Sequence, residues 1–415
     1  MPLKDFMHTQ NSRPQRRILL CVSGMSPAVI TETLYALVTQ ATPFMPDEVH
    51  VVTTALGKQK ILAELLPPST GQFHRLVQEF LPNHPIRFDA ETVNVIQEAG
   101  IDLEDITTDT HNKSAANALY GVMRALKSVP STVLHASVAG GRKSMSFYMG
   151  HAFSLLAEPL DTLSHVLVSA PFETVRGFYY PPKLPIELDF KGQTISTKDA
   201  NIQLAELSVL KLGSILGKDW PTKAQTDFDF AIRLAQATFE PPQMVVKFDR
   251  EKHKGLLEVC GETINLSPLE FAVFAVHALA RKHEGDLVNG AKVNDLKNID
   301  PAFAFFLEEQ MNREFLHLKK KTESDHIYSK VHKKLHDIVG AVADHFTIDA
   351  IGERVKNQNR PTQLKAPANC LTLVAYGGAG VPPQGWQLKA PANCLTLVGL
   401  DHWYSRVQAV LGVKR

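Results

Sequence analysis

The sequence has few cysteines, and no two of them form a metal-binding pair. Only four occur in 415 residues. They are Cys21, Cys260, Cys370 and Cys394. None has a second cysteine at the spacing of a CxxC motif, so a zinc site built on thiolates is not expected. No HxxxH or HExxH pattern joins His111, His135 and His151, and we therefore predict neither a metal ion nor another cofactor.

The sequence also lacks an excess of charge and long apolar runs. Lys and Arg total 44 against 43 Asp and Glu, which gives a net charge of +1. This balance argues against a protein that coats nucleic acid non-specifically, although it allows a local basic pocket. No segment reaches the roughly 18 to 20 apolar residues of a membrane span, and the N-terminal segment lacks the apolar region of a signal peptide. We therefore expect a cytoplasmic protein that does not contact membranes.

The first half of the chain alternates short apolar runs with segments of helical spacing. Strands are predicted at residues 17–23, 49–54, 132–138 and 165–169, with a further strand near 86–88. Helices are predicted at residues 28–40, 58–66, 70–81, 112–127 and 143–156. Such alternation is typical of an α/β domain whose mainly parallel sheet is covered on both faces. We assign this Rossmann-like domain to residues 1–200.

The pattern changes after residue 200. Residues 201–243 are predicted to be a helical linker, with helices at 201–216 and 222–238. Residues 244–362 are predicted to be a winged-helix-like α+β domain, with strands at 244–248 and 255–259, a long helix at 325–346 and a hairpin or wing at 347–360. Another helix is expected to begin after Ser267, because Ser267, Pro268 and Glu270 suit the N-cap, the first position and the capping box.

The tail, residues 363–415, contains an identical repeat. The twelve residues 363–374 recur without change at 387–398. Repeats of a solenoid share a pattern rather than every residue. A recent duplication in the coding DNA explains this identity better than a functional array, and we assign the repeat no chemistry.

Two glycine-containing loops carry the chemistry that the sequence suggests. The first loop is Ser23 to Pro27, and the second runs from Ala139 to Met145. Each follows a predicted parallel strand, and ligands of open α/β sheets bind at the carboxyl ends of such strands. The glycines allow the backbone to approach a ligand closely, and the N-terminus of a helix attracts phosphate. The two loops therefore predict a cradle for phosphodiester groups.

The side chains of these loops suit the same ligand. Arg142 and Lys143 supply positive charge, and Ser23, Ser26 and Ser144 supply hydroxyl groups. Neither loop is a known nucleotide fingerprint, because GGRKS lacks the first glycine of a P-loop and no GxGxxG follows the first strand. A P-loop ATPase and a Rossmann dehydrogenase are therefore disfavoured.

The runs ILLCVSGMSPAVITETLYAL, VVTT and SVAGGRKSMSFYMGHAFSLL resemble the CARF domains of CRISPR-associated proteins, and most of all those of ring nucleases. The resemblance covers roughly residues 15 to 185. It implies a homodimer that binds one cyclic oligoadenylate across its two-fold axis, with cyclic tetra-adenylate favoured. It also implies metal-independent cleavage, in which a ribose 2′-OH attacks the adjacent phosphorus and leaves a 2′,3′-cyclic phosphate.

Carried over onto the matching residues, the resemblance assigns roles within both loops. Lys143 is expected to assist cleavage, and Ser26 or Ser144 to orient the 2′-OH. With residues at the ends of nearby strands and helices, the expected ligand-contacting set is Ser23, Gly24, Met25, Pro27, Thr31, Thr54, Thr108, Asp109, Gly140, Gly141, Arg142 and Met145.

Other interpretations of these residues remain open. A plain strand-to-helix turn also explains Gly140 and Gly141, and helix capping explains Thr108 and Asp109. Lys143 could equally hold a phosphate in the ground state without assisting cleavage.

Other functions remain open as well. A HEPN ribonuclease, common beside CARF domains, needs an arginine and a histidine with four to six residues between them, and no arginine here has that spacing. A transcription regulator is possible, with DNA bound through the second domain. The basic patch of that domain, Lys319 to Lys321 with Lys330, Lys333 and Lys334, could contact DNA phosphates or simply be a solvated helix face. A third possibility is a protein that binds the messenger without cleaving it.

Overall fold

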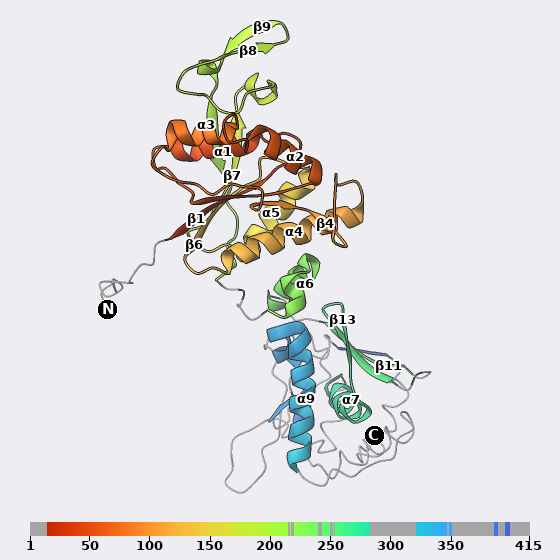
Figure 1. The fold of residues 1–415 in the computed structure, drawn as a ribbon. Helices are drawn as coiled ribbons and strands as arrows, with labels where there is room; N and C mark the ends of the chain where they lie inside the picture. The colour runs from red at the N-terminus through yellow and green to blue at the C-terminus, as the bar shows by residue number, and fades with distance from the viewer. Residues whose placement is uncertain are drawn as a thin grey trace, which may run out of the picture. The chain divides into compact units, whose positions relative to one another are not determined.

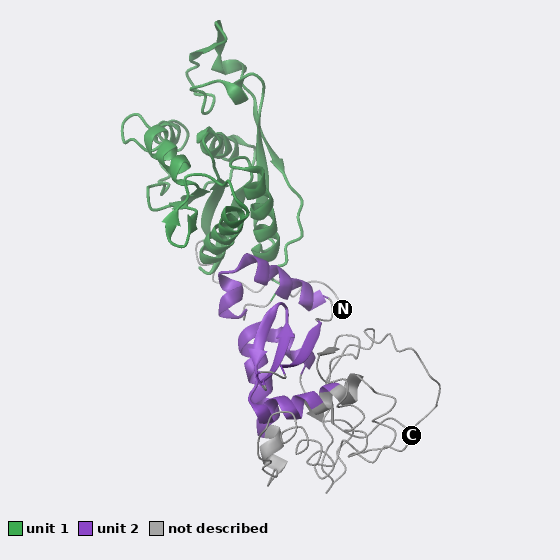
Figure 2. Cartoon of the chain, turned by 90° about the vertical axis from the view of Figure 1, so that its right-hand side faces the viewer, with its two compact units in different colours: residues 1–217 green, residues 218–415 purple. Residues whose placement is uncertain are grey.

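The computed structural model divides the chain into two compact units, residues Met1–Gly217 and Lys218–Arg415. Figure 2 shows the two units in different colours. The structure describes residues 15–214, 216, 220–239, 243–249, 252, 254–282, 321–346, 348–350, 386–388 and 395–398. None of the helices in these ranges is long and apolar enough to cross a membrane.

Unit 1 is built on a six-stranded sheet of order β10-β7-β6-β1-β2-β3. The strands are β1 Arg16–Val22, β2 Glu48–Thr53, β3 Val93–Val95, β6 Thr132–Ser137, β7 Thr162–Val168 and β10 Ile202–Glu206. All neighbours pair in parallel except β10, which is antiparallel to β7. In β1 the five residues from Ile18 to Val22 are at most 1% exposed, as expected of a central strand covered on both faces. The predicted α/β fold with a mainly parallel sheet is confirmed.

Helices cover both faces of this sheet (Figure 1). They are α1 Ala28–Thr39, α2 Ala55–Glu64, α3 Gln72–Phe80, α4 Asp109–Lys127 and α5 Lys143–Leu156. The first three lie on one face, where their apolar side chains pack with Leu19 and Cys21 of β1. Helices α4 and α5 lie together on the other face. Two short hairpins are added, β4 Gln97–Glu98 with β5 Ile101–Asp102, and β8 Glu187–Phe190 with β9 Gln193–Ser196.

Two predictions for this unit are wrong. The strand expected near residues 86–88 is reduced to a single bridge between Glu48 and Arg87, and the third strand along the chain is β3. The helix expected at 201–216 begins instead with strand β10, in which Leu204 pairs with Val166 of β7. Ile202 and Leu204 alternate with polar residues, a period of two that favours a strand. The first unit therefore ends near residue 217 and not at residue 200.

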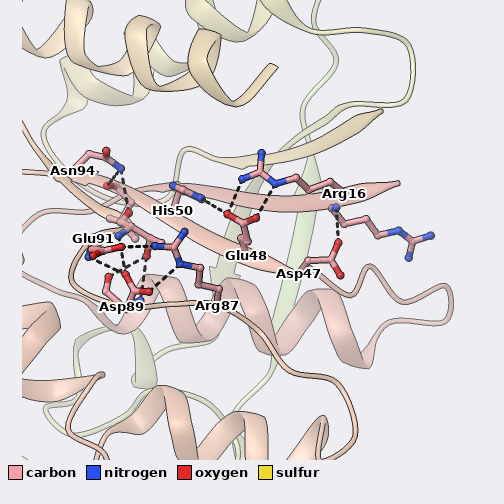
Figure 3. Close-up of polar contacts among 11 residues, drawn as sticks. Arg16, Asp47, Glu48, His50, Arg87, Asp89, Glu91 and Asn94 are labelled. Atoms are coloured by element: carbon pink, nitrogen blue, oxygen red, sulfur yellow. Dashed lines mark hydrogen bonds and ion pairs between the residues drawn. The ribbon is translucent and has the colours of Figure 1, made fainter. Parts of the chain in front are cut away.

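A charged cluster holds together the amino ends of β1 and β2 (Figure 3). Arg16 donates two hydrogen bonds of 2.7 Å to the two carboxylate oxygens of Glu48. His50 Nε2 lies 2.9 Å from Glu48 Oε2 on the other side. These partners, Arg16 above all, lower the pKa of Glu48 to about 2. The cluster lies at the opposite end of the strands from the loops that follow them.

Unit 2 contains a four-stranded sheet of order β13-β12-β11-β16. The strands are β11 Met244–Asp249, β12 Lys254–Val259, β13 Glu262–Asn265 and β16 Leu395–Val398. The described helices of this unit include α6 Phe228–Phe239, α7 Pro268–Lys282 and α9 Lys321–Val339, which is followed by the 3-10 helix η5 Gly340–Phe346. The capping box of α7 is confirmed, since Ser267 N donates to Glu270 Oε2 over 2.8 Å and Glu270 N donates to Ser267 Oγ over 3.4 Å.

The end of the chain departs from the predicted hairpin. Strand β14, Ile348–Ala350, pairs with β15, Trp386–Leu388, while residues 351–360 lie outside the described part of the structure. The second copy of the repeat contributes to β15 and supplies β16, which pairs in parallel with β11. The first copy also lies outside the described residues. The winged-helix assignment stays a prediction.

Candidate functional site

The two predicted loops meet at one edge of the sheet in unit 1. Strands β1 and β6 are parallel neighbours, with Cys21 opposite Ser137, so the loops leave adjacent strands in the same direction. A Cβ atom placed on Gly24 would lie 3.2 Å from the Cα of Gly141. One placed on Gly140 would lie only 2.5 Å from the carbonyl oxygen of Val22. The predicted meeting of the loops is confirmed. It requires glycine at position 140, where a side chain would collide with β1, and favours glycine at position 24, where a side chain would crowd the second loop.

The second loop turns directly into helix α5. Gly141 has a φ of +77°, a conformation that favours glycine, and α5 begins two residues later at Lys143. The N-cap residue Arg142 is extended and makes no side-chain capping bond within the described structure. The first turn of α5 therefore presents its partial positive charge at the edge where the loops meet.

The two cations of this loop have different surroundings. Arg142 forms an ion pair with Asp105, in which Nε lies 3.1 Å from Oδ1 and Nη2 contacts Oδ2. This pairing lowers the pKa of Asp105. Lys143 is exposed and makes no hydrogen bond or ion pair with any residue that the structure describes. The ammonium group of Lys143 is thus available to an added anion, whereas the Arg142 guanidinium already has a carboxylate partner.

The three predicted serines are not equivalent. Ser23 is buried, and its hydroxyl donates to the carbonyl of Ser26 over 3.4 Å. Ser144 donates to the side-chain oxygen of Asn112 in α4 over 2.7 Å. Ser26 is exposed beside Met25, which is also exposed. Of the three hydroxyls, that of Ser26 is therefore the most accessible to a ligand.

Several residues from the predicted set have structural roles. Thr54 caps α2 by accepting a bond from Gly57 N over 3.3 Å, and Thr108 caps α4 by accepting one from His111 N over 3.1 Å. Asp109 forms an ion pair of 2.9 Å with Lys113, one turn later in the same helix. The capping interpretation of Thr108 is confirmed.

Three further residues from this set are buried. Thr31 is fully buried, and its hydroxyl donates to the carbonyl of Ala28 within α1. Met145 is 1% exposed and packs beneath the turn, 2.8 Å from the position of a Cβ on Gly141. Both face the domain interior, and their contact with a ligand stays a prediction. Pro27 is buried too, at the start of α1.

Sequence reasoning missed Gly57 and Asp105, which shape the same edge. A Cβ on Gly57 would lie 2.0 Å from Thr53 Oγ1 and 3.0 Å from the carbonyl oxygen of Gly24, so glycine lets α2 approach the first loop. Thr53 Oγ1 is buried without a hydrogen-bond partner in the described structure. Asp105 was missed because no pattern in the sequence links it to Arg142. Gly57 could have been found from its position, because a glycine in the first turn of a helix suggests a close approach to a neighbouring segment.

The described residues contain no group of three or more His, Cys, Asp or Glu side chains that could hold a metal ion. His135, which the sequence places within a strand, is buried between two hydroxyls. Its ring nitrogens lie 2.7 Å from Ser164 Oγ and 2.6 Å from Thr162 Oγ1, and burial lowers its pKa to about 4. It is a core residue of the sheet.

The family model of CRISPR-associated protein NE0113 matches residues 26–238, slightly more than half of the 415 residues. The chain belongs to this family of CRISPR-associated proteins. The match begins at Ser26 in the first loop, includes the whole second loop and ends in α6. It agrees with the resemblance of the first half to CARF domains.

The remaining comparisons add little to this family membership. No curated protein matches the chain. One similar solved structure is Enterococcus italicus Csm6 bound to cyclic hexa-2′-fluoro-hexa-dAMP, with 14% identity and a TM-score of 0.24. The similarity covers 37% of this chain, which spans only 34% of that protein.

Proposed function

We propose that this CRISPR-associated protein binds a cyclic oligoadenylate, with tetra-adenylate favoured, where the loops after β1 and β6 meet, and cleaves it without a metal. The observation that carries the proposal is the contact between Gly24 and Gly141 beside the unpaired Lys143. Two backbone turns, a helix N-terminus and a free ammonium group at one sheet edge suit a ring of phosphodiesters. A homodimer would present two such edges to one ring.

The proposed reaction needs only groups of the ring and of the loops. A ribose 2′-OH attacks the adjacent phosphorus in line and loses its proton, the bond from phosphorus to the 5′-oxygen breaks, and that oxygen gains a proton. The product is a linear fragment with a 2′,3′-cyclic phosphate. Lys143 would stabilise charge on the phosphorane or on the leaving oxygen, and Ser26, the exposed hydroxyl, would orient the 2′-OH.

The experiment is a cleavage assay of the full chain with cyclic tetra- and hexa-adenylate in EDTA. Lys143→Ala is expected to lower the cleavage rate by about 100-fold, while the Kd for the ring changes by less than about tenfold, because the charge is needed most in the transition state. Lys198→Ala, which removes an exposed lysine from the 3-10 helix at Thr197–Asp199, is the matched control and should leave both unchanged.

The possible outcomes separate cleavage from binding. Normal cleavage by the Lys143→Ala variant would remove this residue from the mechanism. Tight binding with no products from the unaltered protein would reduce the function to sequestering the messenger. No binding of either ring would end the proposal.

A second candidate function is DNA binding by unit 2 under control of the ring. Lys330 and Lys333 lie one turn apart on α9 and are both exposed, whereas Lys334 is held by Glu270 at 2.6 Å. Two exposed lysines on one helix face could contact neighbouring phosphates. A gel-shift assay with and without cyclic tetra-adenylate tests this candidate, and the Lys330→Ala/Lys333→Ala double variant should abolish any shift.

A further inference from the structure

Unit 1 contains a cavity of about 540 Å³ that shares no residue with the two loops. One wall is helix α3, and the other is the segment 177–186 that precedes the β8–β9 hairpin. Phe178 and Tyr180, 3% and 6% exposed, contribute buried aromatic surface to the lining. Leu184 and Ile186 also line it and remain largely exposed to solvent. The cavity is therefore aromatic on one side and bounded by exposed apolar side chains.

Hydrogen bonds connect the two walls of this cavity, helix α3 and the segment 177–186. Glu79 of α3 accepts hydrogen bonds from the backbone N–H of Lys183 and, over 3.4 Å, from the hydroxyl of Tyr180. Tyr179 donates to Glu64 of α2 over 2.8 Å, and the Lys183 ammonium lies 5.0 Å from the centre of the Phe80 ring. These contacts hold the segment against two helices, so the cavity is formed before any ligand arrives.

One arginine of the lining, Arg75, forms no ion pair within the described part of the chain. Arg75 lies one turn before Glu79 on α3, a spacing at which the two side chains commonly pair. The oxygens of Glu79 are directed instead to Tyr180 and Lys183, and Arg75 makes no ion pair with any carboxylate in the described residues. Its guanidinium therefore remains free to bind an anion beside an apolar surface.

We propose that this cavity is a second binding site, for a small organic anion with an apolar body such as an aryl or alkyl carboxylate or sulfonate. The acidic group would bind Arg75, and the apolar body would lie against Phe178, Leu184 and Ile186. The volume is within the roughly 300–1,000 Å³ of small-molecule sites, which are mainly apolar with a few polar groups that fix orientation. A guanidinium binds the two oxygens of such an acid together.

The test is a fluorescence titration of the full chain with 8-anilinonaphthalene-1-sulfonate, an aromatic sulfonate. We expect saturable binding of one molecule per chain. Arg75→Gln should raise the Kd at least tenfold by removing the charge. Arg17→Gln, at an exposed arginine of β1 outside the cavity, is the matched control and should bind as the unaltered protein does. Leu184→Asp should also weaken binding, because it replaces apolar surface with a repelling carboxylate.

Both test positions are exposed, so neither variant should unfold the domain, and melting curves would check this. The proposal is overturned if the probe shows no saturable binding. It is also overturned if the Arg75→Gln and Leu184→Asp variants bind the probe as tightly as the unaltered protein does. The Lys143→Ala variant should bind the probe normally. Failure of the site at the loops would therefore leave this result unaffected.

Discussion

At the scale of single residues, the two adjacent cations at the start of α5 have different partners. Arg142 pairs with Asp105, whereas Lys143 forms no ion pair in the described structure. Asp105 neutralises Arg142 in the free protein, and a phosphate that binds Arg142 must compete with this carboxylate. Both partners are about half exposed, and an exposed ion pair contributes little to the stability of the fold. The competition therefore affects ligand affinity more than the stability of the fold.

Removing the competing carboxylate should strengthen binding of the ring. Asp105→Asn is expected to lower the Kd for cyclic tetra-adenylate about two- to fivefold, as measured by calorimetry. Asp189→Asn, at an exposed position of β8, is the control. Weaker binding by Asp105→Asn would show instead that Asp105 holds Arg142 in its binding orientation.

The buried carboxyl of Glu32 in α1 offers a test by pH. Glu32 is 6% exposed and has no partner among the described residues, and burial raises its pKa to about 7. Because the folded pKa is above the unfolded value, any stability that the group gives is present at low pH and lost as pH rises through 7.

Glu32→Gln should therefore stabilise unit 1 at pH 8 by about 2 kcal/mol, with the difference vanishing near pH 4.5. Hydrogen exchange of peptides from β1 reports on this unit within the full chain. Equal protection of both proteins at pH 8 would mean that the carboxylate is stabilised by solvent.

The individual site residues show where sequence reasoning works. Lys143 and Ser26 were predicted from their positions after strands, and both are exposed where the loops meet. Thr31 and Met145 lie within helices next to those loops, and only the rotational phase of each helix decides that they face inward. Asp105 depends on a contact across 37 residues of sequence, which local pattern cannot predict.

At the scale of elements, the close approach of the two loops requires glycine at specific positions. A Cβ on Gly140 would collide with the Val22 carbonyl at 2.5 Å, whereas one on Gly121 within α4 would meet nothing within 4 Å. The same substitution should thus have opposite effects at the two sites.

Gly140→Ala is expected to destabilise unit 1 by about 2 kcal/mol or more and to weaken ring binding, because one loop must shift. Gly121→Ala should stabilise it by about 0.5–1 kcal/mol, since alanine favours the helix. Hydrogen exchange and calorimetry measure both effects. A Gly140→Ala variant with normal stability and affinity would contradict the close contact of the loops.

Strands and helices differed in how well the sequence predicted them. The buried runs that became β1, β2, β6 and β7 were recognised because they are continuous and apolar. Strand β10 was mistaken for part of a helix, because an edge strand is only half covered and its alternation spans just five residues. Its partner β7 is more than thirty residues away, so pairing rather than local preference decides its conformation.

At the scale of the whole molecule, the boundary of unit 1 affects where the chain can be divided. Strand β10 covers the edge of β7, and a chain ending at residue 200 would leave that edge unpaired. A chain ending at residue 217 should melt at a higher temperature than one ending at residue 200, and it should not aggregate. The chain ending at residue 200 should aggregate. Equal melting temperatures of the two, measured by circular dichroism, would show that β10 is dispensable.

Helix α5 connects the point where the two loops meet with the chain segment that follows β10. Its first residue is Lys143, at the meeting point of the loops, and its last turn binds the segment that follows β10. Ser154 accepts a bond from Leu212 N over 2.8 Å and donates to the carbonyl of Leu210 over 2.7 Å. The helix spans about 20 Å as a rigid rod. An anion that shifts the first turn of α5 should therefore also move Leu210 and Leu212, which the last turn of the helix holds.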